Sequence, residues 1–520
     1  MDEKISDALR RDMADKQIDI DLTVRILDNY NAGRYDHVKP VEVESIPEID
    51  GATIVDRSRI GMSAPRKAVN SRLDELGIDP SAVLPPGSGE TVTFGERELE
   101  RIGIALLPLL SYGILNGGSA TSYADRTKNR GFNSSLFGLL EPHFDRMAAL
   151  CVGRAKGITP AFIQPDGTPG PSFIELKMRA LLVQALQHRK MFPKSDISLT
   201  PGLPIFQMTS NSNNAEIART YDEYRTSPML EPLIAATGFD PTRALTGIQP
   251  LLAAFTHSSQ GRPKRVFDQA NGRKDSALPL PGGHGQNFAV LRTIYNDLRR
   301  AGKRYVYIGN VDNLGFTPDP AALAYLALSG RQAAFDFAFR TPVDVKGGIL
   351  VKDRNGGLTC ADIGPAISTE EMLRAEAAGS GILFNCATGL FDLDYLVRRL
   401  DDIIENLPMR FSDQDKDAGR YSQAEQVTWE IIGMLDEFVV FGVDKWRRFL
   451  AAKLLMETLM TSGVRLDDPS YPTSENPSQD IRGTARLLHE GLTRQLSSVY
   501  GMEQTPGKWI PLGVERIGTS

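Results

Sequence analysis

The sequence contains few cysteines, no long apolar run and no excess of positive charge. Its three cysteines in 520 residues are too few and too scattered for a disulfide framework or a zinc site. No stretch approaches the roughly 18 consecutive apolar residues that a membrane span needs, and the N-terminus lacks the apolar core of a signal peptide. The net charge of −6 argues against general nucleic-acid binding, which requires a basic surface. These absences predict a cytoplasmic protein that has neither membrane nor nucleic acid as a partner.

The sequence has the composition of a globular protein, and its strand-like apolar runs alternate with helical patterns as in an α/β protein. Hydrophobic residues make up 41% and charged residues 24% of the chain, as in ordinary globular domains. Apolar runs alternate with helical patterns between residues 97 and 400. The expected strands are 110–116, 203–210, 304–311, 345–351 and 381–386, and the expected helices are 97–108, 172–191, 214–224, 286–301, 320–330, 369–377 and 392–404. This alternation predicts an α/β sheet covered by helices.

Three regions are expected along the chain. Residues 1–95 are predicted to form a helical N-terminal extension, and residues 96–410 the core. Residues 411–520 are predicted to be a mostly helical C-terminal region without internal repeats. Outside the core, helices are expected around 2–30, 66–77, 422–436, 444–462 and 480–499, a boundary or hinge at 85–89 and a polar loop at 409–420.

The most informative stretch is 304–320, where a buried strand ends in Asn310-Val311-Asp312-Asn313. In open α/β sheets, ligands bind outside the carboxyl ends of the strands. A carboxylate at such an end suits a hard cation such as Mg²⁺, which one or two carboxylates hold together with substrate phosphates. An ordinary turn after a strand is the alternative, because Asp and Asn favour turns.

A second candidate is the glycine-rich loop that follows the strand at 110–116. Asn116-Gly117-Gly118 is followed by small hydroxyl residues and then by Lys128. Consecutive glycines let the backbone approach a phosphate, and a lysine adds positive charge. The spacing fits neither the dinucleotide fingerprint nor the P-loop. A plain strand-to-helix turn remains the alternative.

This loop and six later segments resemble the UDP-glucose pyrophosphorylase family, and they follow one another in the order of that family's motifs. The segments are LNGGSATS (115–122) with Lys128, FQMTSNSNN (206–214), LPGGHGQNF (280–288), NVDNLGFTPD (310–319), VKGGILV (345–351), FNCAT (384–388) and RRFLAAK (447–453). The resemblance implies a Rossmann-like, GT-A-like nucleotidyltransferase core that depends on Mg²⁺. It also implies that UTP and a hexose 1-phosphate react to give a UDP-sugar and pyrophosphate.

The resemblance also implies roles for individual residues. Lys128, Lys453 and Asp312 would be catalytic, with Asp312 as the metal ligand. The nucleotide-binding residues would be Asn116, Gly117, Gly118, Met208, Gln249, Gly283 and His284. The sugar-binding residues would be Asn310, Lys346, Gly347, Asn385 and Thr388. His284 is not expected to act as a general base, because a sugar phosphate is already anionic at neutral pH.

Several departures from the family pattern keep alternatives open. Ala120 and Ala124 stand where glycine is usual, Ala387 and Thr388 replace asparagines, and the C-terminus lacks the family's β-helical repeat. Glucose 1-phosphate is the leading substrate. The alternatives are a UDP-N-acetylhexosamine or broad UDP-sugar pyrophosphorylase and a non-catalytic UDP-sugar-binding regulator. The sequence leaves the sugar and the oligomeric state open.

Overall fold

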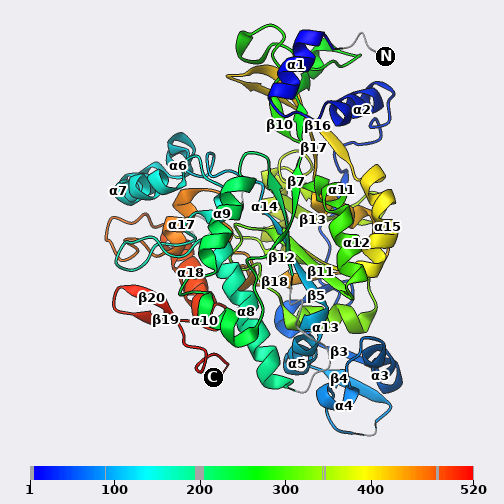
Figure 1. Ribbon diagram of the computed structural model, residues 1–520, viewed down its shortest axis with the longest axis vertical. Coiled ribbons are helices and arrows are strands. Elements are labelled where there is room, and N and C mark those ends of the chain that lie inside the picture. The colour runs from blue at the N-terminus through cyan, green and yellow to red at the C-terminus, as the bar shows by residue number, and fades with distance from the viewer. Residues whose placement is uncertain are drawn as a thin grey trace.

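The computed structural model describes residues 5–87, 89–193, 204–341, 344, 347–475 and 480–518. Its centre is an 11-stranded sheet with helices on both sides (Figure 1). The main strands, in spatial order, are β2 (Ile54–Asp56), β18 (Phe438–Val443), β12 (Ala333–Phe339), β15 (Leu383–Asp392), β11 (Tyr305–Asn310), β5 (Leu110–Leu115), β6 (Ile205–Ser210) and β7 (Leu245–Gln249). The remaining strands are β1 (Val43–Ser45), β13 (Gly348–Asp353) and β14 (Leu358–Asp362). The predicted α/β fold with a mixed sheet is confirmed.

The direction of the strands determines which side chains meet at one edge of the sheet. Strands β11, β5, β6 and β7 are parallel, as are β12, β18 and β2, and β15 runs antiparallel between β11 and β12. The carboxyl ends of the parallel strands therefore lie at the same edge as the beginning of β15. Asn310 pairs in register with Leu115, and Gly309 pairs with Thr388.

Alternating residues of β11 enter two different cores. Tyr305 and Tyr307 join one core with residues of α5 (Glu96–Leu106), α8 (Phe173–Met191) and α13 (Pro320–Ser329). On the other face, Val306 and Ile308 pack with residues of the following helices: α11 (Asn287–Val290), α12 (Arg292–Arg300) and α15 (Leu393–Asn406). This burial on both faces explains why the strand reads as a continuous apolar run. The expected helix at 214–224 is α9 (Asn214–Tyr224), and that at 369–377 is α14 (Thr369–Ala377).

The N-terminal helices cover smaller sheets at one end of the molecule (Figure 1). Helices α1 (Asp7–Asp15) and α2 (Ile20–Asn31) pack there. Their partner strands are β8 (Leu251–Ala253), β9 (Phe255–Thr256), β10 (Pro279–Pro281), β16 (Met409–Lys416) and β17 (Gly419–Gln426). At the opposite end lie α3 (Arg66–Glu75), α4 (Pro80–Val83), β3 (Met62–Pro65) and β4 (Thr91–Phe94). The helices expected around 2–30 and 66–77 are confirmed.

The start of the C-terminal region differs from the sequence prediction. The loop expected at 409–420 and the helix expected at 422–436 are wrong, because these residues form the hairpin β16–β17 and a 3-10 helix, Thr428–Met434. Most residues of the hairpin are half-buried or exposed, which gave it the polar composition of a loop. Only two short helices occupy 444–462, namely α16 (Lys445–Arg448) and α17 (Leu455–Thr461).

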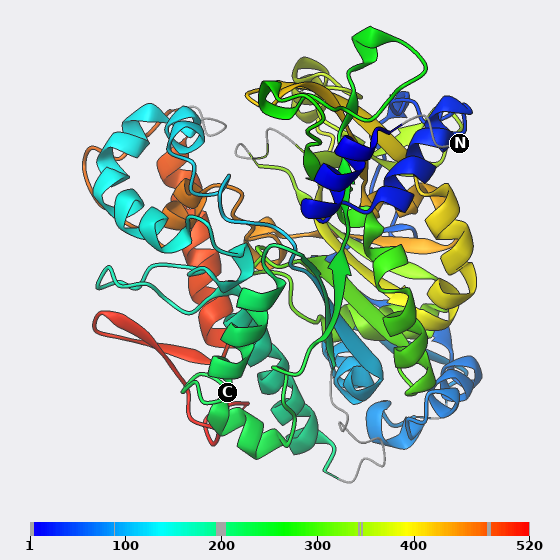
Figure 2. The same ribbon diagram turned by 45° about the horizontal axis from the view of Figure 1, so that its top comes forward.

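The last part of the chain contains the expected helix. Helix α18 (Ile481–Arg494) continues as a π-helix, Gln495–Val499, and the hairpin of β19 (Met502–Thr505) and β20 (Lys508–Pro511) follows. Two helices that the sequence did not predict, α6 (Arg126–Phe132) and α7 (Ser134–Cys151), pack beside α17 (Figure 2). They occupy the part of the chain between the glycine loop and α8.

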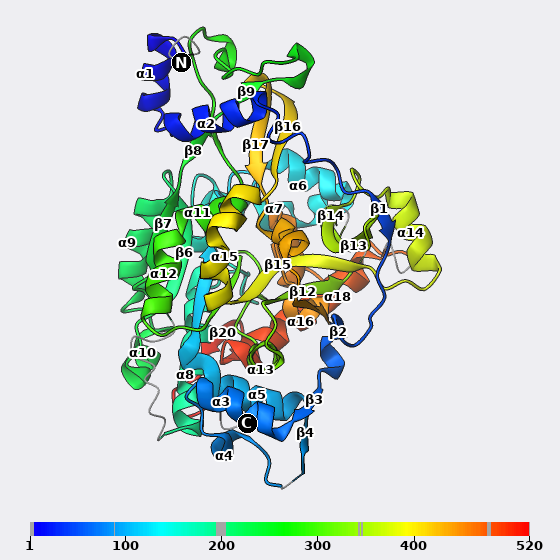
Figure 3. The same cartoon turned by 90° about the vertical axis from the view of Figure 1, so that its right-hand side faces the viewer.

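Segments outside 96–410 also supply strands to the central sheet. Strand β2 pairs with β18, and β1 pairs with β13 along the side of the molecule (Figure 3). The division of the chain at 95/96 and 410/411 remains a prediction about domains. Among the residues that the structure describes, no helix is both long and apolar enough to cross a membrane.

Candidate active site at the carboxyl edge of the sheet

A pocket of about 260 Å³ lies at the edge that strand direction predicts. It gathers six residues that the sequence named as site residues from segments far apart in the chain. They are His284, Asn310, Asp312, Gly347, Asn385 and Lys453. The antiparallel strand β15 brings Asn385 to the carboxyl ends of its parallel neighbours, which explains the convergence.

Asp312 pairs with a lysine that the sequence analysis did not single out. The Nζ atom of Lys156 lies 2.5 Å from Oδ2 of Asp312 and also donates to the carbonyl oxygen of Ala452. The same ammonium group lies 4.9 Å from the ring centroid of Tyr123. The other carboxylate oxygen of Asp312, Oδ1, accepts no hydrogen bond from the described residues. Lys156 is followed by Gly157 in the segment between the glycine loop and α8. This Lys-Gly pair is the sequence feature that could have pointed to Lys156 as a site residue.

Three contacts fix the turn that carries Asp312. The buried ammonium group of Lys177 donates to the carbonyl oxygens of Asn313 (2.7 Å) and Phe316 (2.9 Å). Asn313 Nδ2 donates to the carbonyl oxygen of Arg448 at 3.1 Å. A Cβ atom on Gly315 would lie 2.3 Å from the carbonyl carbon of Arg448, so only glycine fits there. Burial lowers the pKa of Lys177 to about 7.

The pocket offers oxygen ligands suited to a hard cation. The described residues contain no group of three or more His, Cys, Asp or Glu side chains that could hold a metal ion alone. Mg²⁺ does not need such a group, because substrate phosphates and water complete its coordination. Oδ1 of Asp312 and the carboxylate of Asp362, which lines the same pocket, therefore fit a phosphate-bound divalent cation.

His284 is held as a neutral ring at the pocket wall. The backbone N–H of Thr428 donates to Nδ1 at 3.1 Å, which leaves the proton of the neutral ring on Nε2. Burial lowers the pKa of His284 to about 4. At neutral pH the ring can donate a hydrogen bond from Nε2, and it carries no charge.

The predicted nucleotide-binding residues divide into two groups. Gln249 Nε2 donates to the carbonyl oxygen of Gly283 at 2.7 Å, and a Cβ atom on Gly117 would lie 3.4 Å from Gln249 Oε1. These three residues therefore meet, and a Cβ atom on Gly118 would find no atom within 4 Å. The other group is buried away from the pocket. Asn116 donates to Gln207 Oε1, and Met208 packs in the core that holds Phe206 and Phe288.

The predicted sugar-binding residues lie around Asn385. Its Oδ1 accepts from the backbone N–H of Ala387 at 2.8 Å, and its Nδ2 lies 3.4 Å from Cys360 Sγ. Ala387 has a φ of 53°, a left-handed conformation that asparagine adopts more readily than alanine. Thr388 is fully buried and does not line the pocket. Lys346 lies outside the described residues.

The predicted lysines occupy different environments. Lys453 is exposed, lines the pocket and has its Nζ atom 5.8 Å from the Phe384 ring centroid. Lys128 is exposed on α6, where its ammonium group donates to Ser122, and it does not line the pocket. Lys445, eight residues before Lys453, is buried in an ion pair with Asp344 at 2.6 Å.

Comparison with known proteins finds a family match over the later part of the chain. Residues 264–478 match the family described as UTP–glucose-1-phosphate uridylyltransferase. The match includes the segments that supply His284, Asp312, Asn385 and Lys453 to the pocket. The matched segment is less than half of the chain, and over it the chain is similar to the UDP-glucose pyrophosphorylase family.

Individual relatives in this family are distant. The UTP–glucose-1-phosphate uridylyltransferase of Solanum tuberosum is 25% identical over 256 residues, which is 46% of this chain and 53% of the relative. The probable enzyme of Schizosaccharomyces pombe is 33% identical over 93 residues, 17% of this chain and 18% of the relative. The chain therefore spans at most about half the length of these curated relatives.

Solved structures share the fold over most of the chain. The UDP-glucose phosphorylase of Trypanosoma brucei has a TM-score of 0.52 at 17% identity and covers 91% of this chain and 80% of its own. The uridine diphosphate N-acetylglucosamine pyrophosphorylase of the same organism has a TM-score of 0.57 at 15% identity and covers 94% and 92%. At these identities the likeness shows a shared fold and nothing more.

Proposed function

We propose that the protein is a UTP–hexose-1-phosphate uridylyltransferase, with glucose 1-phosphate as its leading substrate. An oxygen of the sugar phosphate would attack the α-phosphorus of UTP, and the bond from this phosphorus to the departing pyrophosphate would break. The observation that carries the proposal is the pocket in which Asp312, His284, Asn385 and Lys453 converge. The family match of residues 264–478 supports the same reaction class.

The residues of the pocket would act by positioning and by neutralising charge. Because the attacking phosphate is already ionised, the reaction needs no general base, which agrees with a neutral His284. Lys453 and Lys156 would stabilise the negative charge that grows on the leaving pyrophosphate. Lys128, which follows the glycine loop, is proposed to contact the outer phosphates. Asn310, Gly347 and Asn385 would orient the sugar.

Asp312, with Asp362 nearby, would hold a divalent cation, and we propose Mg²⁺. Such a cation neutralises phosphate charge in nucleotidyl transfer. The ion pair with Lys156 orients the Asp312 carboxylate whether or not the cation is present.

A second candidate is a UDP-sugar-binding regulator without turnover. It is favoured by the same ion pair, because Lys156 occupies one oxygen of the predicted metal ligand. The two functions predict different outcomes for one experiment.

That experiment is a pyrophosphate-release assay with UTP, Mg²⁺ and a panel of sugar 1-phosphates. The panel should contain glucose, galactose and N-acetylglucosamine 1-phosphates, and calorimetry should follow UTP and UDP-glucose binding in parallel. Release of pyrophosphate with glucose 1-phosphate supports the first proposal, and a preference for N-acetylglucosamine 1-phosphate transfers it to the alternative sugar. Binding of UDP-glucose without pyrophosphate release from any sugar would establish the regulator. Absence of both would refute both functions.

A further inference from the structure

Lys156 is attached to three segments that the proposed reaction uses. Its backbone N–H donates to the carbonyl oxygen of Gly118 in the glycine loop at 3.0 Å. Its ammonium group bridges Asp312 and the carbonyl oxygen of Ala452, which directly precedes Lys453. The position of this side chain therefore matters to the glycine loop, to the predicted cation ligand and to the C-terminal lysine.

The ring of Tyr123 lies against this ammonium group. Lys156 Nζ is 4.9 Å from the ring centroid, within the range of a cation–π interaction. Burial raises the pKa of the Tyr123 phenol well above its usual value, so the phenol is neutral and the attraction comes from the ring face. Such contacts are stronger for a cation removed from water, and the Lys156 side chain is only 12% exposed.

Tyr123 is itself held by hydrogen bonds to two helices. It is 2% exposed, and its hydroxyl shares a hydrogen bond of 2.6 Å with Oγ1 of Thr458 on α17. Its carbonyl oxygen accepts from the backbone N–H of Leu455 at 3.0 Å and from Nδ2 of Asn129 on α6 at 2.9 Å. Oδ1 of Asn129 accepts in turn from the N–H of Met456 at 2.9 Å. The ring is therefore a fixed surface against which a side chain can be positioned.

Lys264 shows what is particular to Lys156. Lys264 also faces a tyrosine ring, with Nζ 5.2 Å from the centroid of Tyr30. Its ammonium group has three acceptors, which are the carbonyl oxygen of Thr256 and the hydroxyls of Ser258 and Ser422. An ammonium group has three N–H donors, and Lys156 has only two acceptors among the described residues. One donor of Lys156 therefore has no acceptor in the protein, whereas Lys264 has an acceptor for each.

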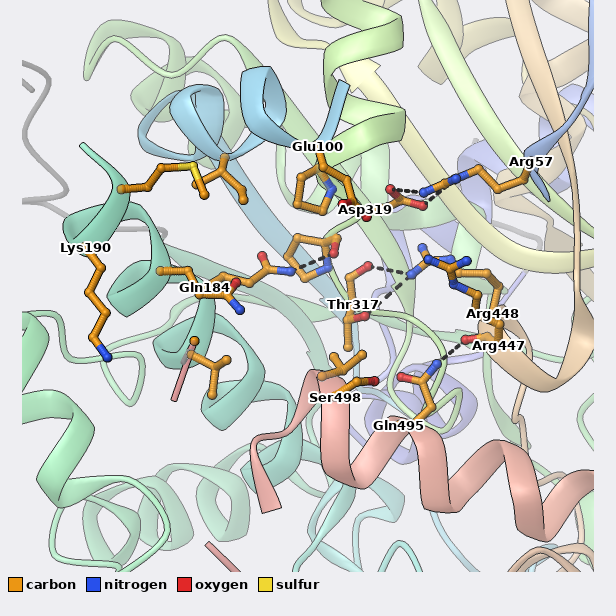
Figure 4. Close-up of a pocket in the computed structure, with 18 residues that line it drawn as sticks. Arg57, Glu100, Gln184, Lys190, Thr317, Asp319, Arg447, Arg448, Gln495 and Ser498 are labelled. Carbon is orange, nitrogen blue, oxygen red and sulfur yellow. Dashed lines mark hydrogen bonds and ion pairs between the residues drawn. The ribbon is translucent and has the colours of Figure 1, made fainter. Parts of the chain in front are cut away.

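Carboxylates and carbonyls hold the buried arginines of a neighbouring cavity of about 630 Å³ (Figure 4). Arg57 pairs with both oxygens of Asp319 at 2.9 Å. Arg448 donates to the carbonyl oxygen of Thr317 at 3.0 Å and pairs with Asp336 at 2.9 Å. These acceptors use the hydrogen bonds of the cations that they hold. A ring face instead attracts the whole ammonium group and needs no hydrogen bond from it.

We propose that Tyr123 is a positioning residue for Lys156. Its ring holds the ammonium group beside Asp312 and leaves the third N–H for an oxygen of the nucleotide's phosphates. This role rests on the proposed function, in which Lys156 stabilises the negative charge of the leaving pyrophosphate. The contact between the ring and the ammonium group does not rest on it, and the two are tested separately.

The contact is tested without any ligand, by acetylating the lysines of the full chain with acetic anhydride and following each lysine by peptide mass spectrometry. Tyr123→Leu removes the ring and should raise the labelling rate of Lys156 at least roughly 3-fold, because the ammonium group loses part of its attachment. Tyr123→Phe keeps the ring and should label like the wild type. Lys67, exposed on α3, should label equally in all three proteins. An unchanged rate in Tyr123→Leu, or an equal rise in Tyr123→Phe, overturns the proposal.

The role in the reaction is tested by steady-state pyrophosphate release. Tyr123→Leu should lower kcat roughly 10-fold, whereas Tyr123→Phe should retain the wild-type kcat within about 3-fold. The KM of the sugar 1-phosphate should change less than about 3-fold in both, since the lysine acts on charge that grows during the reaction. Tyr30→Leu removes the ring beside Lys264 and is the matched control, expected to leave both constants unchanged. Equal losses of kcat in Tyr123→Leu and Tyr30→Leu would refute the role.

A double-mutant cycle separates positioning from a general loss of structure. In the Lys156→Met background, Tyr123→Leu should lower kcat by less than about 2-fold further, because the ammonium group that the ring holds is already absent. A further loss as large as in the wild-type background would show that Tyr123 acts through the fold alone. If Tyr123→Leu does not fold, Tyr123→Met, which has a longer side chain and no ring, takes its place in every measurement.

The same cycle distinguishes this inference from the proposed function. If the wild type binds UTP and releases no pyrophosphate from any sugar 1-phosphate, the cycle is measured on the Kd of UTP by calorimetry, and additive effects there refute the positioning role. If the wild type binds neither UTP nor UDP-glucose, the proposed function and the role that rests on it are refuted together. The labelling of Lys156 then still decides whether the ring holds the ammonium group.

Discussion

Two aspartates on one loop, Asp312 and Asp319, show how similar ion pairs serve different purposes. Asp319 binds the Arg57 guanidinium group through both oxygens at 2.9 Å, and its Oδ1 also accepts from Ala322 N–H at the start of α13. Asp312 meets Lys156 through one oxygen and turns toward a pocket. An acid whose oxygens are all engaged by its own protein stabilises the fold, whereas an acid with an oxygen to spare can bind a ligand.

The largest expected effect is a loss of activity when Asp312 is replaced. Asp312→Asn should lower kcat by roughly 10³-fold, because the variant loses the charge that holds a cation on the phosphates. Steady-state pyrophosphate release measures it, and circular dichroism should show an unchanged fold. A variant that retains more than about a tenth of the wild-type rate would show that this carboxylate is not the ligand.

The matching substitution at the other acid should act on stability. Asp319→Asn leaves the buried Arg57 with the partly exposed Glu96 as its remaining charged partner, which is expected to cost about 3 kcal/mol of unfolding free energy. Urea denaturation measures this loss. If Asp319→Asn instead proves as stable as the wild type and loses turnover, the distinction between the two acids is wrong.

Three lysine variants test how much each positive charge contributes to the proposed reaction. Lys156→Met and Lys453→Met should each lower kcat roughly 10²-fold, since each removes positive charge from the leaving group. Lys128→Met should lose about 10-fold, because outer phosphates are less affected by the reaction. Steady-state kinetics measures all three.

Lys67→Met is the control for the lysine series, because Lys67 is exposed on α3 at the opposite end of the molecule from α1 and α2. Lys445 would be an unsuitable control, because it is buried in an ion pair with Asp344. Should Lys128→Met exceed Lys156→Met in its effect, the assignment of the two lysines reverses.

The sequence predicted the fold and six residues of the pocket because those features depend on local patterns. Strand β11 is apolar throughout and is followed by Asp312, which locates both the sheet and its ligand edge. The Lys156–Asp312 pair depends on contacts between residues far apart in the chain, and no local pattern encodes them. The same holds for Met208, whose position at a strand end gave no sign that its side chain faces the core. The hairpin β16–β17 was missed because a polar strand at the surface resembles a loop in composition.

The smallest expected effect is a pH dependence from the histidine at the edge of the pocket. Burial holds the pKa of His284 at about 4, below the value of about 6.5 for an unfolded chain. Because the unfolded state binds the proton first, the stabilising contribution is complete above pH 6.5 and is lost as the pH falls toward 4. At pH 5 the unfolding free energy should be lower by on the order of 1–2 kcal/mol than at pH 7.5 from this group alone. His188 is buried with a pKa of about 4 and contributes in the same direction, so the wild type loses more in total.

His284→Gln keeps a polar side chain that does not titrate, and urea denaturation at the two pH values should show a smaller loss for this variant than for the wild type. Equal losses would mean that His284 takes up its proton in the folded protein. The ring would then be charged at pH 5 and would be a third positive charge near Asp312, in addition to Lys156 and Lys453.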